Sequence, residues 1–285
     1  MSTPVIDFHL HAVYYANHSP HVESWLRKIQ GKSQAQWQAF VEEYSRPASF
    51  SLFLRESGVD YGVVLAEISP LTTGICPNEY VAGFCRGQEN LIPFASINPF
   101  MVANPRNELV RLAREHCIRG LKLYPSYNYF YPNDRMLYPV YEKAEELQIP
   151  VMVHTGSSVF KGSRLKYGDP LLLDDVAVDF PGLTLLMVHS GRGVWYNQSF
   201  FLARLHPNVY MEIAGLPPRK LLEYFPELER NADKIIFGSD WPGVASIREN
   251  IEAVRGLPLL ESTKEKILGG NAARILRIPL KARNG

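Results

Sequence analysis

The sequence predicts a parallel (β/α)8 barrel, a TIM barrel, and three observations support this fold class. Eight short apolar runs occur along the 285 residues. From the second run onward their ends are roughly 25–35 residues apart, about the length of one strand with its helix. The runs lack polar alternation, as expected of strands buried on both faces. Segments with an apolar stripe beside charged residues lie between them. This alternation favours one barrel domain over residues 1–285.

The predicted elements follow in order along the chain. The strands are expected at residues 5–11, 61–67, 91–98, 120–124, 150–155, 183–190, 209–214 and 235–240. Amphipathic helices are expected at residues 108–116, 138–147, 171–180, 220–230 and 247–255. Residues 12–55 form a long insertion after the first strand, and their spacing predicts small helices over the barrel mouth. The stretch 124–132 is rich in tyrosine and proline, which predicts an ordered loop beside the substrate.

Composition narrows the classes of partner. The chain is 46% apolar and carries 30 Lys and Arg against 29 Asp and Glu, a formal net charge of +1. No long basic stripe is present, so we expect no nucleic acid as a main partner. The apolar runs have strand length, which predicts no membrane span. Three sparse cysteines and no signal-peptide pattern predict a cytoplasmic protein. A small-molecule substrate is the expected partner, and a homodimer stays open.

Histidines and an aspartate end four of the predicted strands. His9 and His11 lie two residues apart on the first strand, so their imidazoles point to the same side. His154, His189 and Asp240 end three later runs. Strand ends converge at one rim of a closed barrel, so these side chains can meet around one ion. Imidazole nitrogen and carboxylate oxygen together predict one divalent metal, with Zn²⁺ favoured and Mn²⁺ or Fe²⁺ as alternatives.

The residue types also suggest how such a site would react. A divalent metal lowers the pKa of its bound water to about 7 and so supplies hydroxide near neutral pH. Asp240 would be ionised beside the cation, where it can both ligate and relay a proton. His189 can protonate a leaving group or stabilise a developing oxyanion. We therefore expect Asp240 and His189 to be catalytic.

Four further charged residues are candidates around the metal. Arg192 lies in Ser-Gly-Arg-Gly, and its guanidinium suits a substrate carboxylate, with a salt bridge to a neighbouring loop as the alternative. Lys122 is expected to bind a substrate carboxylate or to pair with Glu212. Glu67 ends the second run and is expected to orient a histidine ligand or to pair with Lys122.

Three aromatic residues complete the predicted pocket. Tyr124 and Tyr127 belong to the tyrosine-rich loop and are expected to face the substrate. Trp241 directly follows Asp240 and is expected to shape the floor or rim of the pocket. Packing in the core is the alternative role for Trp241.

As an ordered set, these motifs resemble the amidohydrolase superfamily. The segments that carry the resemblance are Asp7-Phe-His-Leu-His11, Gly120-Leu-Lys-Leu-Tyr-Pro125, His154-Thr-Gly156, His189-Ser-Gly191, Gly238-Ser-Asp-Trp-Pro242 and Gly270-Asn-Ala-Ala-Arg-Ile-Leu276. Within the superfamily, the chain is similar to the branch that includes the aminocarboxymuconate-semialdehyde and resorcylate decarboxylases and some lactonases. The resemblance covers nearly the whole chain.

The resemblance implies roles for particular residues. His9, His11, His154 and Asp240 match the metal ligands, and His189 matches a histidine beside the metal that acts as an acid, a base or a polarising group. Lys122 lies where two-metal members carry a carboxylated lysine. A second metal on Lys122 is not expected, because this branch is generally mononuclear.

Three functions fit this site, and the first is favoured from the sequence. It is a metal-dependent hydrolase that acts on a small ester, lactone or amide, with a carboxylate on the substrate. The alternative is a metal-dependent decarboxylase, a carboxy-lyase, of a small aromatic or unsaturated carboxylic acid. The least favoured is a non-catalytic metal-binding protein, because the ligand set is intact. The shared ligands do not separate the first two.

Overall fold

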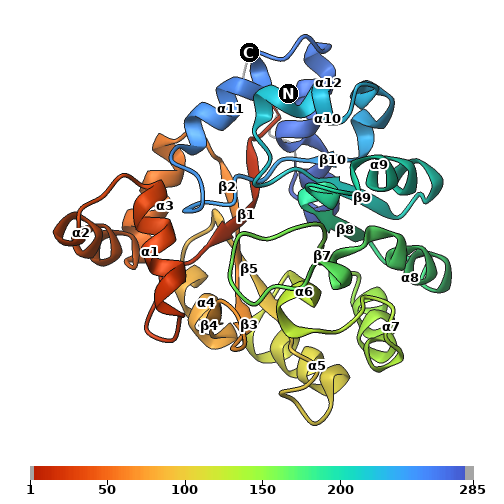
Figure 1. Cartoon of the computed structure of the whole chain (residues 1–285), viewed down its shortest axis with the longest axis horizontal. Coiled ribbons are helices and arrows are strands. Elements are labelled where there is room, and N and C mark those ends of the chain that lie inside the picture. The colour runs from red at the N-terminus through yellow and green to blue at the C-terminus, as the bar shows by residue number, and fades with distance from the viewer. Residues whose placement is uncertain (1–2, 280–285) are drawn as a thin grey trace.

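A computed structural model describes residues 3–279 as an eight-stranded parallel barrel surrounded by helices (Figure 1). The strands pair in the order β1-β2-β5-β6-β7-β8-β9-β10. Their bounds are β1 Ile6–His11, β2 Tyr61–Leu65, β5 Leu91–Ser96, β6 Gly120–Leu123, β7 Val151–His154, β8 Leu185–Val188, β9 Val209–Glu212 and β10 Ile235–Ile236. The predicted fold class is confirmed, and the strands follow the eight apolar runs.

Helices connect successive strands on the outside of the barrel (Figure 1). Their bounds are α1 Pro20–Ile29, α2 Gln34–Tyr44, α3 Pro47–Glu56, α4 Asn78–Cys85, α5 Pro105–His116, α6 Pro125–Asn128, α7 Tyr138–Glu146, α8 Leu173–Asp179, α9 Tyr196–Leu205, α10 Leu221–Tyr224, α11 Ile247–Arg255, α12 Glu261–Glu265 and α13 Asn271–Leu276. Side-chain hydrogen bonds fix the first residues of two of these helices. Asn104 and Ser246 accept hydrogen bonds from the first turns of α5 and α11.

A bulge in β1 redirects His9, the first histidine of the predicted metal site. The pairing of β1 with β2 shifts by one residue between Asp7 and Leu10. Phe8 packs among the interior side chains of the barrel, and His9, the next residue, lines the cavity at the strand ends. The buried Asp7 carboxylate stabilises the bulge by accepting hydrogen bonds from the backbone N–H groups of His9 and Ser239, at 3.1 and 2.9 Å. Bulges of this kind are known to redirect side chains at functional sites.

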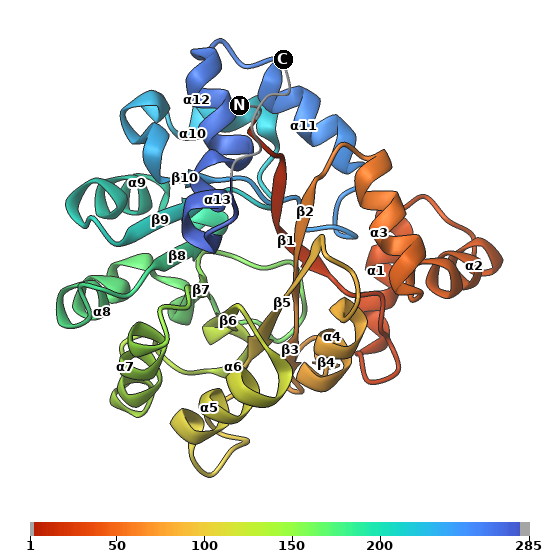
Figure 2. The ribbon, with the colours of Figure 1, turned by 180° about the vertical axis from the view of Figure 1, so that it is seen from behind.

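Backbone hydrogen bonds beyond β10 complete the barrel. The regular β10 strand ends at Ile236, two residues into the run expected at 235–240. The seam to β1 continues through three bonds, from Phe8 N to Phe237 O, from Asp240 N to His9 O and from His11 N to Trp241 O, at 3.0, 3.0 and 2.9 Å. The opposite, amino-terminal end is filled by α13, whose Ala272 packs against the interior residues (Figure 2).

Two parts of the predicted pattern are wrong. The helix expected at 220–230 is broken into the short α10 and 3-10 turns. Pro226 lacks a backbone N–H and disfavours helical geometry at Phe225, whose φ is −133°. The second run does not extend as one strand to residue 67. An antiparallel hairpin of β3 Glu67–Ser69 and β4 Gly74–Cys76 follows β2 instead.

No helix within residues 3–279 has the length and apolar character needed to cross a membrane.

Candidate active site

A cavity of about 310 Å³ opens at the carboxyl ends of the barrel strands. This volume is at the lower end of the range for small-molecule sites. Ten of the predicted site residues line this cavity, and Glu212 and Trp241 do not. The ten lining residues are His9, His11, Glu67, Lys122, Tyr124, Tyr127, His154, His189, Arg192 and Asp240.

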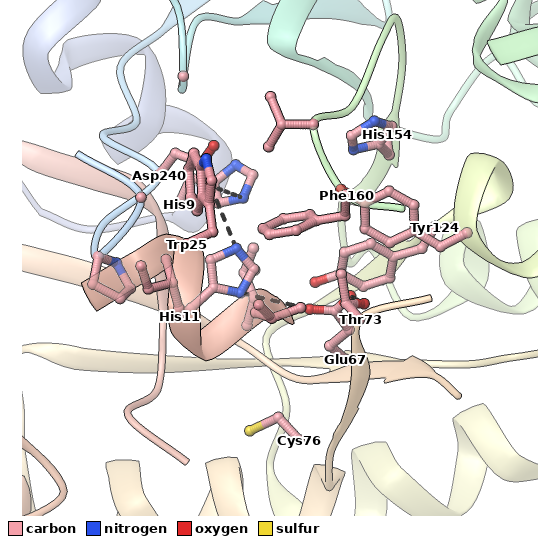
Figure 3. Close-up of a pocket in the computed structure, with 18 of the residues that line it drawn as sticks. His9, His11, Trp25, Glu67, Thr73, Cys76, Tyr124, His154, Phe160 and Asp240 are labelled. Atoms are coloured by element: carbon pink, nitrogen blue, oxygen red, sulfur yellow. Dashed lines mark hydrogen bonds and ion pairs between the residues drawn. The ribbon is translucent and has the colours of Figure 1, made fainter. Parts of the chain in front are cut away.

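Two histidines of β1 meet the aspartate that follows β10 (Figure 3). Asp240 Oδ1 lies 3.4 Å from His9 Nε2 and 3.4 Å from His11 Nε2. One donor atom from each of these residues lies within 4.8 Å of the others. Two imidazole nitrogens and a carboxylate oxygen at this spacing fit a divalent cation.

His154 and His189 lie beside this group. Among residues 3–279, the donor atoms of His9, His11 and Asp240 lie within 4.8 Å of one another without His154, so the structure brings three of the four predicted metal ligands together. The ring of His189 lies 4.8 Å from that of His154 and 5.2 Å from that of His9, measured between centroids. His154 Nε2 is buried without a hydrogen-bond partner in the described part of the chain, which is a costly state that a metal ion would relieve. His189 Nδ1 lies 2.7 Å from the carbonyl oxygen of Ala214. Because a carbonyl only accepts, Nδ1 carries the proton, and Nε2 has a free lone pair.

Burial sets the charge states of these groups. Burial holds the pKa values of His9, His154 and His189 well below the usual value, with nearby Lys122 and Arg192 as further causes. These imidazoles are therefore neutral. Burial alone would raise the pKa of Asp240, but its histidine neighbours and Arg192 together lower it to about 2. Neutral imidazoles around an ionised carboxylate are the state in which such residues bind a metal.

The β3–β4 hairpin brings an acidic partner to His11. Glu67 Oε2 lies 4.0 Å from His11 Nδ1 on the far side of that ring from Asp240. The hydroxyl of Thr73, in the turn of the hairpin, donates a hydrogen bond to Glu67. A carboxylate placed behind a histidine ligand orients the ring and makes it more basic. Thr73 was not expected from the sequence, because the turn has no local pattern that places it in the site.

Glu212 lies beneath the histidines. Its Oε1 is 3.4 Å from His9 Nδ1. Its carboxylate accepts hydrogen bonds from the backbone N–H groups of His189 and Ala214, at 3.2 and 3.1 Å. Burial raises the pKa of Glu212 to about 8, although nearby Lys122 opposes the shift.

Lys122 is fully buried in the wall of the cavity. Its Nζ has no hydrogen-bond partner among the residues that the structure describes, and it lies 5.1 Å from the centroid of the Tyr124 ring. Burial lowers the pKa of Lys122 to about 8. Lys122 was expected to form an ion pair with Glu212 or Glu67. Neither ion pair is present in the structure described for residues 3–279.

Arg192 is fixed beside Asp240. Its Nε and Nη2 donate hydrogen bonds to the carbonyl oxygen of Ser157, at 3.2 and 2.8 Å. Gly215, whose φ is +67°, has no side chain and so leaves a space between the remaining nitrogen, Nη1, and the Asp240 carboxylate. A Cβ at this position would lie 2.6 Å from Arg192 Nη1 and 2.8 Å from Asp240 Oδ2. Nη1 and Oδ2 therefore flank the same small space at the edge of the cavity.

Comparison with known proteins identifies the family. The profile of the amidohydrolase family matches residues 6–278. The chain belongs to the amidohydrolase family. A gamma-resorcylate decarboxylase from Rhodococcus jostii (strain RHA1) is 23% identical over 181 residues, which cover 49% of this chain and 54% of that enzyme. This amidohydrolase thus spans about half the length of the relatives that it matches in sequence.

Solved structures show the same fold over nearly the full length. An uncharacterized TIM-barrel protein from Bordetella bronchiseptica has a TM-score of 0.77 and 26% identity, covering 96% of this amidohydrolase and 98% of that chain. A 5-carboxyvanillate decarboxylase from Novosphingobium aromaticivorans DSM 12444, complexed with manganese and 4-hydroxy-3-methoxy-5-nitrobenzoic acid, has a TM-score of 0.68 and 14% identity, covering 97% and 96%. A 4-oxalomesaconate hydratase from Rhodopseudomonas palustris has a TM-score of 0.65 and 20% identity, covering 96% and 95%.

Aromatic side chains wall the cavity of this amidohydrolase. Tyr124 and Tyr127 stack with their ring centroids 5.6 Å apart. Trp25 of α1 and Phe160, in the loop after β7, pack edge to face at 5.2 Å (Figure 3). The sequence did not single out Phe160, because the loop that carries it has no regular periodicity.

The structure corrects the role expected for Trp241. Its side chain is 1% exposed and does not line the cavity. It packs in an aromatic cluster with four residues of α2 and α3, namely Phe40, Tyr44, Phe50 and Phe53. The backbone continues alongside β1 through Trp241, so Asp240 faces the site while the indole of the next residue packs against α2 and α3. Core packing therefore accounts for Trp241.

Proposed function

We propose that this protein is a metal-dependent decarboxylase of a small aromatic carboxylic acid. The observation that carries the proposal is the fixed Arg192 guanidinium beside Asp240 and the histidines, within a cavity walled by aromatic rings. A cation held next to the metal ligands is suited to the carboxylate that is lost. The named relatives support the same choice, because the sequence matches are gamma-resorcylate decarboxylases.

This proposal replaces the preference for hydrolysis drawn from the sequence. The matched decarboxylases support carbon dioxide release, and no observation in the cavity favours an ester, lactone or amide. The hydratase at 20% identity supports the fold alone. Hydrolysis is therefore an outcome that the experiment below must be able to detect.

His9, His11, His154 and Asp240 would hold one divalent cation, which supplies a Lewis acid for the substrate oxygens when bound. Arg192 would orient the carboxylate through Nη1, since its other donors already bind the Ser157 carbonyl. The aromatic walls would hold the ring and exclude water. Mn²⁺ and Zn²⁺ both suit this set of nitrogen and oxygen ligands.

The reaction needs one proton delivered to carbon. The bond between the ring and the carboxylate breaks, carbon dioxide leaves, and the electron pair stays on the ring carbon, which takes up a proton. Asp240 Oδ2 faces the same space as Arg192 Nη1, whereas Oδ1 faces the histidines. Oδ2 is therefore the atom placed to relay a proton from solvent to this carbon. His189 Nε2, whose lone pair is free, can accept a hydrogen bond from a hydroxyl of the substrate.

The test is product analysis on protein reconstituted separately with Mn²⁺ and Zn²⁺. A panel of hydroxylated benzoic acids, including 2,6-dihydroxybenzoate and 5-carboxyvanillate, is incubated in D₂O, and carbon dioxide and the arene are quantified. We expect equal amounts of both, deuterium at the former carboxyl position, and loss of turnover with chelator. Chelator-sensitive hydrolysis of a parallel lactone and ester panel, with no carbon dioxide from any acid, would contradict the proposal.

A further inference from the structure

One wall of the cavity is built from two segments that are fastened together. The loop after β1 and the turn of the β3–β4 hairpin are joined by hydrogen bonds from Ser19 N to Thr73 O and from Ile75 N to Asn17 O, both 2.9 Å long. The hydroxyl of Ser19 donates a third bond to Thr72 O at 2.7 Å. Gly74 allows this close approach, because a Cβ there would lie 2.4 Å from Asn17 O. The wall is therefore a preorganised surface.

This wall carries two polar atoms without partners. The hydroxyl of Tyr15 and Nδ1 of His18 are buried and make no hydrogen bond to any residue from 3 to 279, and both side chains line the cavity. Their rings pack edge to face with centroids 5.4 Å apart. Tyr15 also packs against Trp37, at 5.5 Å, which fixes its ring from behind. Buried polar atoms usually have partners, so this unpaired couple requires an explanation.

We propose that Tyr15 and His18 form a subsite that binds a neutral hydrogen-bonding substituent, such as a ring hydroxyl, on the substrate of this site. The inference rests on the proposed function for the identity of the ring, and it adds residues that determine specificity. Arg192 binds the carboxylate of the substrate, and Tyr15 and His18 bind a substituent at another position of its ring.

The surroundings favour a neutral group over a second carboxylate. Burial, together with His11, lowers the pKa of His18 to about 4, so its imidazole is uncharged near neutral pH. Glu67 lies in the hairpin that forms the same wall, and Trp25 and Leu26 of α1 add apolar surface. A buried anion would have no cation from this wall. A hydroxyl, by contrast, can donate one hydrogen bond and accept another from the phenol and the imidazole.

The experiment measures ligand binding by calorimetry on the Mn²⁺-loaded full chain. The probes are benzoate, 3-hydroxybenzoate and 4-hydroxybenzoate, which share the carboxylate and differ only in the ring hydroxyl. We expect at least one hydroxylated isomer to bind the wild type tenfold or more tightly than benzoate. A site built around a hydroxyl rejects the analogue that leaves its buried polar groups unpaired.

Tyr15→Phe removes only the hydroxyl and should erase this preference, with the affinity for benzoate kept within about twofold. His18→Phe, which keeps a ring but removes both nitrogens, should reduce the preference in the same way. Tyr14→Phe is the matched control. The Tyr14 ring packs at a tilt against Tyr80, with the ring centroids 4.4 Å apart, and Tyr14 is not among the residues that line the cavity, so the preference should be retained.

Each outcome decides the inference. Equal binding of the three acids by the wild type overturns it, and so does an unchanged preference in Tyr15→Phe, which would indicate that bound water satisfies these atoms. An equal loss of affinity for all three acids would show a merely structural role for Tyr15. A preference that Tyr15→Phe abolishes, without carbon dioxide release from any acid, would keep the subsite and reject decarboxylation.

Discussion

Asp240 and His9 are joined twice, once through the backbone and once through their side chains. The N–H of Asp240 donates to the carbonyl of His9 at 3.0 Å, and Asp240 Oδ1 lies 3.4 Å from His9 Nε2. The first bond belongs to the seam that closes the barrel, and the second contact belongs to the candidate metal site. Closure of the barrel and assembly of the site therefore occur at the same residues.

This double connection predicts that Asp240→Asn separates folding from turnover. The backbone bond is unchanged and the amide has nearly the same shape, so the melting temperature should change by only a few degrees. The amide cannot carry the proton, and turnover should fall on the order of 100-fold or more, since general acid–base groups contribute about 10²–10⁴-fold. Steady-state kinetics and thermal denaturation on the same metal-loaded sample measure both. Near-normal turnover would remove Asp240 from the proton-transfer role.

Metal affinity should depend on the carboxylate behind His11. Glu67→Gln keeps the bond from Thr73 but removes the charge near His11 Nδ1, so Mn²⁺ affinity should fall about 10–100-fold. His11→Ala removes a ligand and should lower the metal content further. Competition with a chelating dye measures both, and Glu252→Gln, on an exposed helix face, is the control. Unchanged affinity in Glu67→Gln would show that the hairpin carboxylate does not act through His11.

The barrel and the residues at its rim could be predicted because they depend on local pattern. Continuous apolar runs reveal buried strands, and a polar residue at the end of such a run lies at the rim. The hairpin that carries Glu67 and Thr73 could not be predicted, because strands of three residues are too short for a periodicity. Tyr15 and His18 were missed for a related reason. Their loop reaches the cavity through bonds to a turn more than fifty residues away in the sequence.

Trp25, which lines the cavity, and Trp241, which follows Asp240, should behave in opposite ways. Trp241→Leu removes part of a buried aromatic cluster and should cost about 2–4 kcal/mol of stability, a drop on the order of 5–10 °C in melting temperature, while substrate affinity changes little. Trp25→Leu removes a ring that lines the cavity and should weaken binding of aromatic acids several-fold with a smaller loss of stability. Calorimetric titration and thermal scans of both variants test the pair. The reverse result would return Trp241 to the substrate pocket.

Gly215 should tolerate no side chain, because the space between Arg192 and Asp240 has no room for a Cβ. In Gly215→Ala the added carbon would lie within 2.6 Å of Arg192 Nη1 and 2.8 Å of Asp240 Oδ2, so one group must move. We expect affinity for benzoate to fall at least tenfold and turnover to fall further.

Gly31→Ala separates this effect from backbone strain. Gly31 has a φ of +62°, close to the +67° of Gly215, but a Cβ there meets nothing within 4 Å. Both variants should lose about 1 kcal/mol of stability from the left-handed conformation, and only Gly215→Ala should lose function. Binding by calorimetry and unfolding by urea give the two quantities separately. Equal activity in the two variants would contradict the placement of Arg192 Nη1 and Asp240 Oδ2 around one substrate carboxylate.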